Sequence, residues 1–178
     1  MTFIELISES PYRAGAAAAA MMLVLVWLVS VRIKDASIVD MFWGLGFSVI
    51  AASCLLVTEN LAPLTAATLW LVILWGVRLF VHLGTRWRRE GEEDYRYQKM
   101  RAHHGEKFWW RSIFTVFTLQ GVLMWLVAMP YMAAAYFGGT VALPGVTIIG
   151  LLIAVAGLIM ETLSDRQLTA FRAKAQPG

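Results

Sequence analysis

The chain has 178 residues, of which 59% are hydrophobic and only 15% charged, and its mean hydropathy is +0.64. A soluble domain of this length has no core large enough to cover so much apolar surface, so lipid must cover part of it. The net charge of +3 is modest and does not suggest a nucleic-acid-binding surface, which needs a basic stripe over a folded soluble face. The single cysteine, Cys54, cannot form an intrachain disulfide.

Five segments are long and apolar enough to cross a bilayer, which takes about 20 residues of α-helix. They cover residues 14–31, 37–57, 63–83, 112–137 and 142–163. The first is expected to remain as a helix, because acidic residues precede it and no signal-peptide cleavage site follows it. Pro130 is predicted to kink the fourth helix or to mark its outer end. The short connections 58–62 and 138–141 predict that the helices they join are antiparallel neighbours.

Basic residues are distributed unevenly between the two ends of these helices. Of the 15 Lys and Arg residues, two follow the first helix, eight lie between the third and fourth, and three follow the fifth. Arg13 alone lies on the other side, and Arg78 lies inside a helix. Because positively charged loops stay in the cytoplasm, the N-terminus is predicted outside and the C-terminus inside. The fold class predicted is an all-α polytopic bundle of about five spans, one transmembrane domain over residues 1–178.

Ionisable side chains inside the predicted helices gather toward the cytoplasmic end. An ionised group at the centre of a span costs about 2.5–3.5 kcal/mol on insertion scales, so such residues usually face protein or water. In this chain they are Asp40 in the second helix, Arg78 and His82 in the third, Glu161 at the end of the fifth, and Asp165 one turn later.

Helical periodicity places these residues on three stripes. At 100° per residue, the stripes are Asp40, Trp43, Gly44 and Phe47; Trp75, Arg78, His82 and Arg86; and, if the fifth helix continues beyond the membrane, Glu161, Asp165, Leu168 and Arg172. Three such stripes predict a pocket that is sunk into the membrane and open to the cytoplasm. Two simpler alternatives remain open. Arg78 and Asp40 could form a structural ion pair, and the side chains of Glu161 and Asp165 could extend to the membrane surface, where water solvates them.

The segment 84–111 holds eight basic and five acidic residues. It is predicted to lie at the membrane surface, anchored by Phe108, Trp109 and Trp110, and its arginines suit a phosphorylated cofactor. No metal site is predicted, because the histidines of His103-His104 lack the four-residue spacing of a helical zinc site. The sequence also contains no P-loop and no dinucleotide-binding glycine motif of the Rossmann type.

Several motifs together resemble a known family, the steroid 5-alpha-reductase-like membrane reductases, and specifically their bacterial branch, domain of unknown function 1295. The matching segments are Lys34-Asp35-Ala36-Ser37-Ile38-Val39-Asp40-Met41-Phe42-Trp43-Gly44, Trp75-Gly76-Val77-Arg78-Leu79 with His82, Gly91-Glu92-Glu93-Asp94-Tyr95-Arg96-Tyr97, Phe108-Trp109-Trp110-Arg111-Ser112, Gln120-Gly121, and Glu161 to Asp165 with Gln167, Leu168 and Phe171. Each motif alone is weak, but the combination is specific and covers nearly the whole chain from Lys34. The resemblance implies a bacterial inner membrane location.

The resemblance also implies a seven-helix-like fold, NADPH as hydride donor, and reduction of an activated carbon–carbon double bond in a lipid-like or steroid-like substrate. By position, Asp165 and Arg172 resemble the family's cofactor-contacting residues, with Glu161, His82 and Arg86 beside them.

Catalysis of such a reduction needs a hydrogen-bond donor at the substrate carbonyl, where negative charge develops. Asp40 resembles the family's acid at that place and can donate only if protonated. Trp75 is a second candidate donor, and Arg78 resembles a pocket arginine.

The sequence departs from the family in one respect. In the family, the part that matches this chain is followed by a segment with Gly-Leu-Trp and Arg-His-Pro-Asn-Tyr, which supplies much of the nucleotide site, and the 178 residues do not contain that segment. The chain is therefore expected to be the N-terminal portion of a longer protein. Two alternative functions are a membrane methyltransferase of the isoprenylcysteine type, which uses S-adenosylmethionine, and a non-catalytic membrane subunit. The predicted partners are membrane lipid and an apolar small molecule, without nucleic acid.

The predicted orientation is tested with fusions to the C-terminus. An alkaline phosphatase fusion should be inactive and a fluorescent-protein fusion bright, because the phosphatase becomes active only after export while the fluorescent protein matures in the cytoplasm. The opposite pair of results would contradict the orientation.

Overall fold

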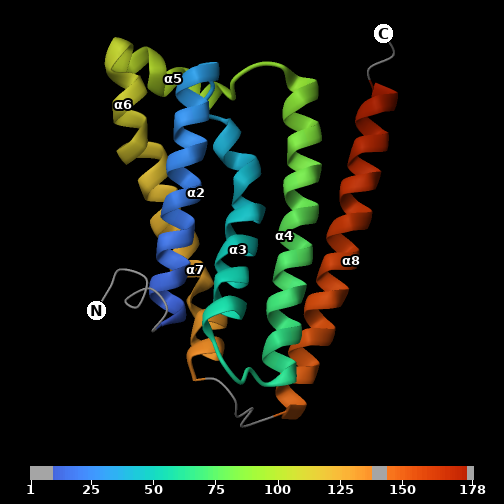
Figure 1. Ribbon diagram of the computed structural model, residues 1–178. Helices are drawn as coiled ribbons and strands as arrows, with labels where there is room; N and C mark the ends of the chain where they lie inside the picture. Colours follow the sequence, from blue (N-terminus) through green and yellow to red (C-terminus); the bar gives the residue numbers. More distant parts are fainter. Residues whose placement is uncertain (1–9, 138–143, 176–178) are drawn as a thin grey trace, which may run out of the picture. The chain divides into compact units, whose positions relative to one another are not determined.

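The computed structural model describes residues 10–137 and 144–175, and no strand occurs among them. The chain forms two compact units, Met1–Thr140 and Val141–Gly178, and each is described by itself. Figure 1 shows the helices of both units. Among the described residues, five helices are long and apolar enough to cross a membrane, which confirms the predicted all-α multi-pass fold.

The first unit contains four long helical rods and one short helix. In chain order its elements are α2 (Pro11–Ile33), α3 (Ile38–Val57), α4 (Pro63–Glu90), α5 (Tyr95–His104), the 3₁₀ turn η1 (Gly105–Lys107), α6 (Phe108–Ser112), the π-helix η2 (Ile113–Thr118) and α7 (Leu119–Tyr136). In the second unit, the described residues form helix α8 (Pro144–Ala175).

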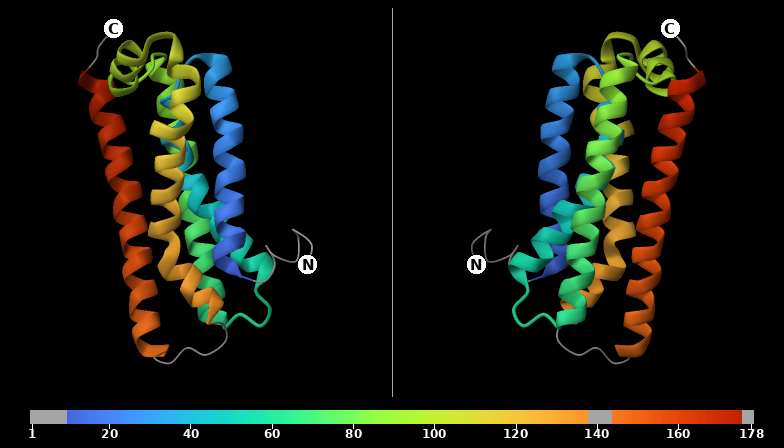
Figure 2. Two further views of the ribbon diagram at one scale, coloured as in Figure 1. Left: turned by 90° about the vertical axis from the view of Figure 1, so that its left-hand side faces the viewer. Right: turned by 90° about the vertical axis from the view of Figure 1, so that its right-hand side faces the viewer.

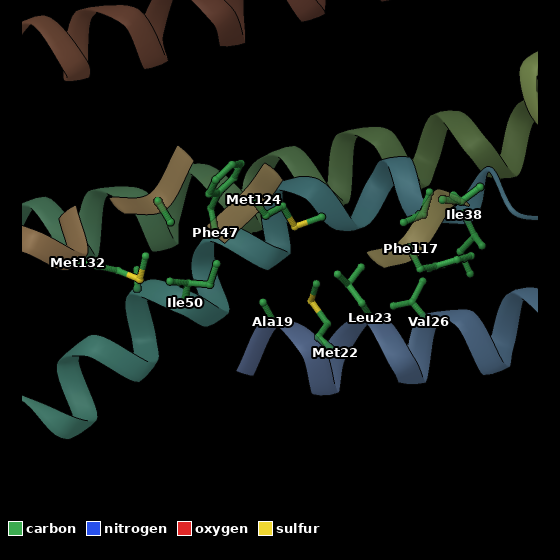
Figure 3. Packing of buried hydrophobic residues seen from close by; sticks show 14 of the residues in the cluster. Ala19, Met22, Leu23, Val26, Ile38, Phe47, Ile50, Phe117, Met124 and Met132 are labelled. Carbon is green, nitrogen blue, oxygen red and sulfur yellow. The ribbon is translucent and has the colours of Figure 1, made fainter. Parts of the chain in front are cut away.

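Helix α3 lies at the centre of the first unit, because it contacts α2, α4 and α7. Buried side chains from α2, α3 and α7 meet between the helices, as Figure 3 shows for Met22, Ile50 and Met124. Outward-facing residues such as Leu25 of α2 and Leu126 of α7 are exposed. A surface with apolar residues outside as well as inside is what a bilayer requires, and hydrogen bonds within each helix satisfy the backbone there.

The helices α3 and α4 cross at two glycines. A Cβ atom built on Gly44 would lie 2.5 Å from the carbonyl oxygen of Gly76, and one on Gly76 would meet the carbonyl oxygen of Gly44. Beside this crossing, the Ser48 hydroxyl donates to the Ile73 carbonyl at 3.0 Å. Small residues let membrane helices approach backbone to backbone, where van der Waals contact replaces the hydrophobic drive that lipid removes.

Several helix ends differ from those expected. Helix α4 ends at Glu90 instead of residue 83, because the first residue with left-handed backbone after it is Gly91, with φ of 68°. A glycine in this conformation is a common helix stop, and the basic residues before it favour the helix C-terminus. Pro130 lies inside α7, which continues to Tyr136, so it does not mark the outer end.

The short connection at 58–62 is confirmed, and α4 follows α3 as an antiparallel neighbour (Figures 1 and 2). The connection at 138–141 lies outside the described residues, so the pairing of the fourth and fifth helices stays a prediction. The stripe that includes Glu161 and Arg172 requires that the fifth helix continue beyond the predicted span. Helix α8 does so, because it extends to Ala175.

Replacing Gly76 with alanine tests the close crossing. The added methyl would strike the backbone of α3, which cannot move aside as a side chain could, so Gly76→Ala should destabilise the protein by at least about 2 kcal/mol. The matched control is Gly84→Ala on the same helix, where a Cβ would meet only Met41 Sδ at an ordinary 3.6 Å. Thermal unfolding in detergent measures both, and equal stability of the two variants would contradict the crossing.

Candidate functional site

A polar cluster occupies one end of the first unit, and it is centred on Asp40 in the first turn of α3. One carboxylate oxygen, Oδ1, accepts a 2.6 Å hydrogen bond from the Tyr97 hydroxyl. The other, Oδ2, accepts from Arg96 Nη2 at 2.7 Å in an ion pair. Both partners come from α5, the short helix that lies across this end of the unit (Figure 1).

The tyrosine hydroxyl continues the network toward the membrane interior. Tyr97 is only 5% exposed, and its hydroxyl oxygen accepts a 3.1 Å hydrogen bond from Gln120 Nε2 of α7. Gln120 Oε1 in turn accepts from Trp43 Nε1 of α3 at 2.6 Å. Buried polar groups are costly unless they are hydrogen-bonded, and here each side chain supplies the partner of the next. The result is one chain of hydrogen bonds that joins α3, α5 and α7.

Local backbone features place these side chains. Asp94 caps the N-terminus of α5 by accepting from the Arg96 backbone N–H at 2.9 Å. Its carboxylate also binds the Arg96 side chain, and this hydrogen bond lowers the pKa of Asp94 from its ordinary value. Directly before α7, the π-helix η2 ends at Thr118, two residues before Gln120. Short π-helical turns within α-helices are frequent at functional sites.

Aromatic rings line the next layer of the unit. The Trp43 ring lies 6.1 Å from the Phe47 ring, which lies 5.8 Å from the Trp75 ring of α4. The Tyr131 hydroxyl of α7 donates to the Phe47 carbonyl at 3.2 Å. The polar chain therefore ends against a layer of packed aromatic side chains.

A second set of contacts holds the loops at this end together. The Glu93 carboxylate accepts two hydrogen bonds from Arg101, at 2.8 and 3.0 Å, and one from the Ala36 backbone N–H at 2.7 Å. Asp35 accepts from Trp87 Nε1 at 2.8 Å. These contacts join the α2–α3 connection to α4 and α5, and they give a structural role to acidic residues of the charged segment 84–111.

The structure places the predicted site residues in two groups. Asp40, Trp75, Arg78, His82 and Arg86 all belong to the first unit, and the α4 stripe runs along one uninterrupted helix from Trp75 to Arg86. Glu161, Asp165 and Arg172 belong to α8 in the second unit. The meeting of the three stripes in one pocket therefore stays a prediction.

Three members of the cluster received no role from the sequence: Tyr97, Gln120 and Arg96. The signal for Gln120 is its position as a lone amide in an otherwise apolar span. No comparable signal marks Tyr97, which lies in a strongly charged segment. As for metals, no group of three or more potential ligands gathers anywhere in the described residues, and His104 instead stacks on Phe108 with ring centroids 6.4 Å apart.

The fold and this cluster define a polytopic α-helical membrane protein with a hydrogen-bonded polar site at its basic end. The chain matches the family described as "Protein of unknown function (DUF1295)" over residues 26–177, and it belongs to that family. This is the branch of the steroid 5-alpha-reductase-like group that the sequence motifs indicated. Neither the comparison with curated proteins nor that with solved structures gave a match.

Proposed function

We propose that the chain belongs to a membrane-embedded, NADPH-dependent reductase that acts on an activated carbon–carbon double bond of a lipid-like or steroid-like substrate. Family membership supports the class of protein. The observation that carries the chemistry is the buried Tyr97 hydroxyl, held between the Asp40 carboxylate and the Gln120 amide.

A neutral hydroxyl at this place meets the main requirement of the reaction. When hydride adds to an enone, negative charge develops on the carbonyl oxygen, and a positioned hydrogen-bond donor stabilises it. Tyr97 keeps its proton at neutral pH. Its one O–H hydrogen is donated to Asp40 in this structure, so in this proposal the O–H turns from Asp40 to the substrate oxygen when substrate binds. Asp40, ion-paired with Arg96, is suited to orient the hydroxyl and not to donate itself. In this proposal Tyr97 takes the donor role that the sequence assigned to Asp40, and Asp40 becomes a positioning residue.

The residues assigned to the cofactor have the chemistry that a phosphorylated dinucleotide needs. Guanidinium groups match phosphate oxygens in pairs, and carboxylates accept hydrogen bonds from ribose hydroxyls. Among the residues that the resemblance assigned to the cofactor, Arg86 and Arg172 carry guanidinium groups, His82 carries an imidazole, and Asp165 and Glu161 carry carboxylates. NADPH, when bound, supplies the hydride to one carbon of the double bond. A proton, taken ultimately from water, then adds to the other carbon and completes the reduction.

The aromatic layer suits the apolar part of the substrate. Phe47 and Trp75 lie in contact beside the inner end of the polar chain, and in this proposal the apolar part of the substrate packs against this layer. A substrate whose ring or chain packs here would present its polar carbonyl toward the basic end. Trp75 keeps its place as a second candidate donor, because its indole N–H needs no change of protonation.

Ligand binding and turnover test this function. The purified protein should bind NADPH and not S-adenosylmethionine, and it should consume NADPH when an enone lipid is added. Tyr97→Phe should lower turnover about a hundredfold, the scale for losing one donor at a developing oxyanion, and leave NADPH affinity nearly unchanged. Arg172→Ala should weaken NADPH binding about tenfold or more, because a charged hydrogen bond is lost.

The matched controls are conservative changes nearby. Tyr95→Phe removes an exposed hydroxyl from the same helix as Tyr97, and Arg166→Ala removes an arginine from α8 that lies off the predicted stripe. Neither should change turnover or affinity. Binding of S-adenosylmethionine instead of NADPH would favour the methyltransferase, and binding of neither would favour a non-catalytic subunit.

A further inference from the structure

The boundary between α2 and the rod formed by α6, η2 and α7 carries two cavities, one above the other. The first is an apolar groove of about 360 Å³. Its floor is formed by the buried Ala19, Leu23 and Phe117, and its rim includes the exposed Ala20 and Val122. The groove therefore opens outward from the first unit, at the depth of the apolar part of α2.

The second cavity lies at the basic end of the same boundary and also measures about 360 Å³. Its wall includes Ser30, Lys34, Arg101, Glu106 and Ser112. The Lys34 side chain is exposed, and its ammonium makes no hydrogen bond or ion pair with any residue that the structure describes. The backbone holds it in place, because Lys34 ends α2 in the left-handed conformation and its carbonyl accepts from Arg101 at 3.0 Å.

The two cavities follow one continuous line along α2. Ala16, Ala20 and Leu23 line the groove, and Ser30 and Lys34 line the polar cavity, at successive steps of three, four or seven residues. Such steps keep side chains on one face of a helix. Between the cavities, Trp27 Nε1 donates to the Trp109 carbonyl at 3.0 Å and joins α2 to α6. From Ala16 in the groove to Ser30 in the polar cavity, the helix rises about 21 Å. The hydrocarbon of one leaflet is roughly 15 Å thick, so the two cavities together extend over the depth of one leaflet.

We propose that this boundary binds an anionic phospholipid of the surrounding bilayer, with an acyl chain in the apolar groove and the phosphate at the polar cavity. An apolar groove that opens outward from a membrane-spanning helix is filled by acyl chains at no cost in desolvation. An anionic headgroup pairs with Lys34, whose ammonium forms no ion pair with the residues that the structure describes. Basic pockets between membrane helices at the cytoplasmic side are a known means of binding such headgroups.

The other charges of the polar cavity set the strength of this site. The Glu93 carboxylate already pairs with Arg101 through two hydrogen bonds, so this guanidinium adds little net charge. Glu106 is negative and opposes a phosphate. Lys34 is therefore the main attractive charge, and removing the Glu106 charge should strengthen binding. The site shares no residue with the Tyr97 cluster, so it does not depend on the proposed reductase activity.

Lipid titration of the purified chain in detergent, followed by native mass spectrometry, tests the proposal. The probes are dioleoyl phosphatidylglycerol and dioleoyl phosphatidylcholine, which differ only in the headgroup. Phosphatidylglycerol should bind more tightly. Lys34→Gln should weaken phosphatidylglycerol binding about fivefold, the effect of one basic residue near a membrane surface, and Glu106→Gln should strengthen it. Ala20→Trp, which fills the groove from its exposed rim, should weaken binding of both lipids.

Arg88→Gln is the matched control, because Arg88 is an exposed basic residue on α4 at the same end of the unit. It should leave both affinities unchanged, and circular dichroism should show that every variant is folded. Equal loss of phosphatidylglycerol binding in Lys34→Gln and Arg88→Gln would mean general attraction to the basic end and would overturn the site. Equal binding of the two lipids by the unaltered chain would overturn it as well.

Discussion

The contact between Gly44 and Gly76 is the constraint on which the first unit depends. In lipid, apolar side chains gain little by leaving the solvent for a neighbouring helix, so packing at close range decides which helices associate. Two glycines allow α3 and α4 to approach until a Cβ on either would strike the other's backbone. Because α3 carries Asp40, Trp43 and Phe47 and α4 carries Trp75, this contact also sets the spacing between the polar cluster and its aromatic layer.

The hydrogen bonds around Tyr97 form the second constraint, and they act across elements that are distant in sequence. Asp40 and Tyr97 are 57 positions apart, and Tyr97 and Gln120 are 23 apart. A polar group without a hydrogen bond is costly away from water. Each side chain of this hydrogen-bond network therefore stabilises the position in which its neighbour can form its own hydrogen bond. Helix α5 is thereby held against α3 and α7, and it covers the basic end of the first unit.

The sequence predicts the fold class and the face of α3 that packs against the rest of the protein. Hydropathy predicted five spans, and the stripe of Asp40, Trp43, Gly44 and Phe47 does face protein, with a different partner for each member. Hydropathy places the end of α4 at residue 83, seven residues too early, because hydropathy falls at the membrane surface whereas the helix continues to Glu90. Charge and hydropathy locate where a helix leaves lipid better than where it ends.

The partners of Asp40 could not be predicted in the same way. Helical periodicity relates residues on one helix, but it does not indicate which side chain of another element they meet. Gln120 is uncharged and therefore stood out less than Arg78 or His82, although an amide in an apolar span also needs a partner. The sequence predicts that the segment 84–111 lies at the membrane surface and that its arginines suit a phosphorylated cofactor. The structure instead pairs Glu93 with Arg101, and Arg96 with both Asp94 and Asp40.

A double-mutant cycle between Tyr97→Phe and Gln120→Leu tests the central claim, that these residues belong to one hydrogen-bonded unit joining α5 to α7. The free energy of unfolding in detergent is measured for both single variants and for the double variant. If the network exists, the two losses are not additive, with an interaction free energy of about 0.5–3 kcal/mol. The same cycle between Tyr97→Phe and Leu56→Ala, at the exposed far end of α3, should give additive losses. Additive losses in both cycles would contradict the network.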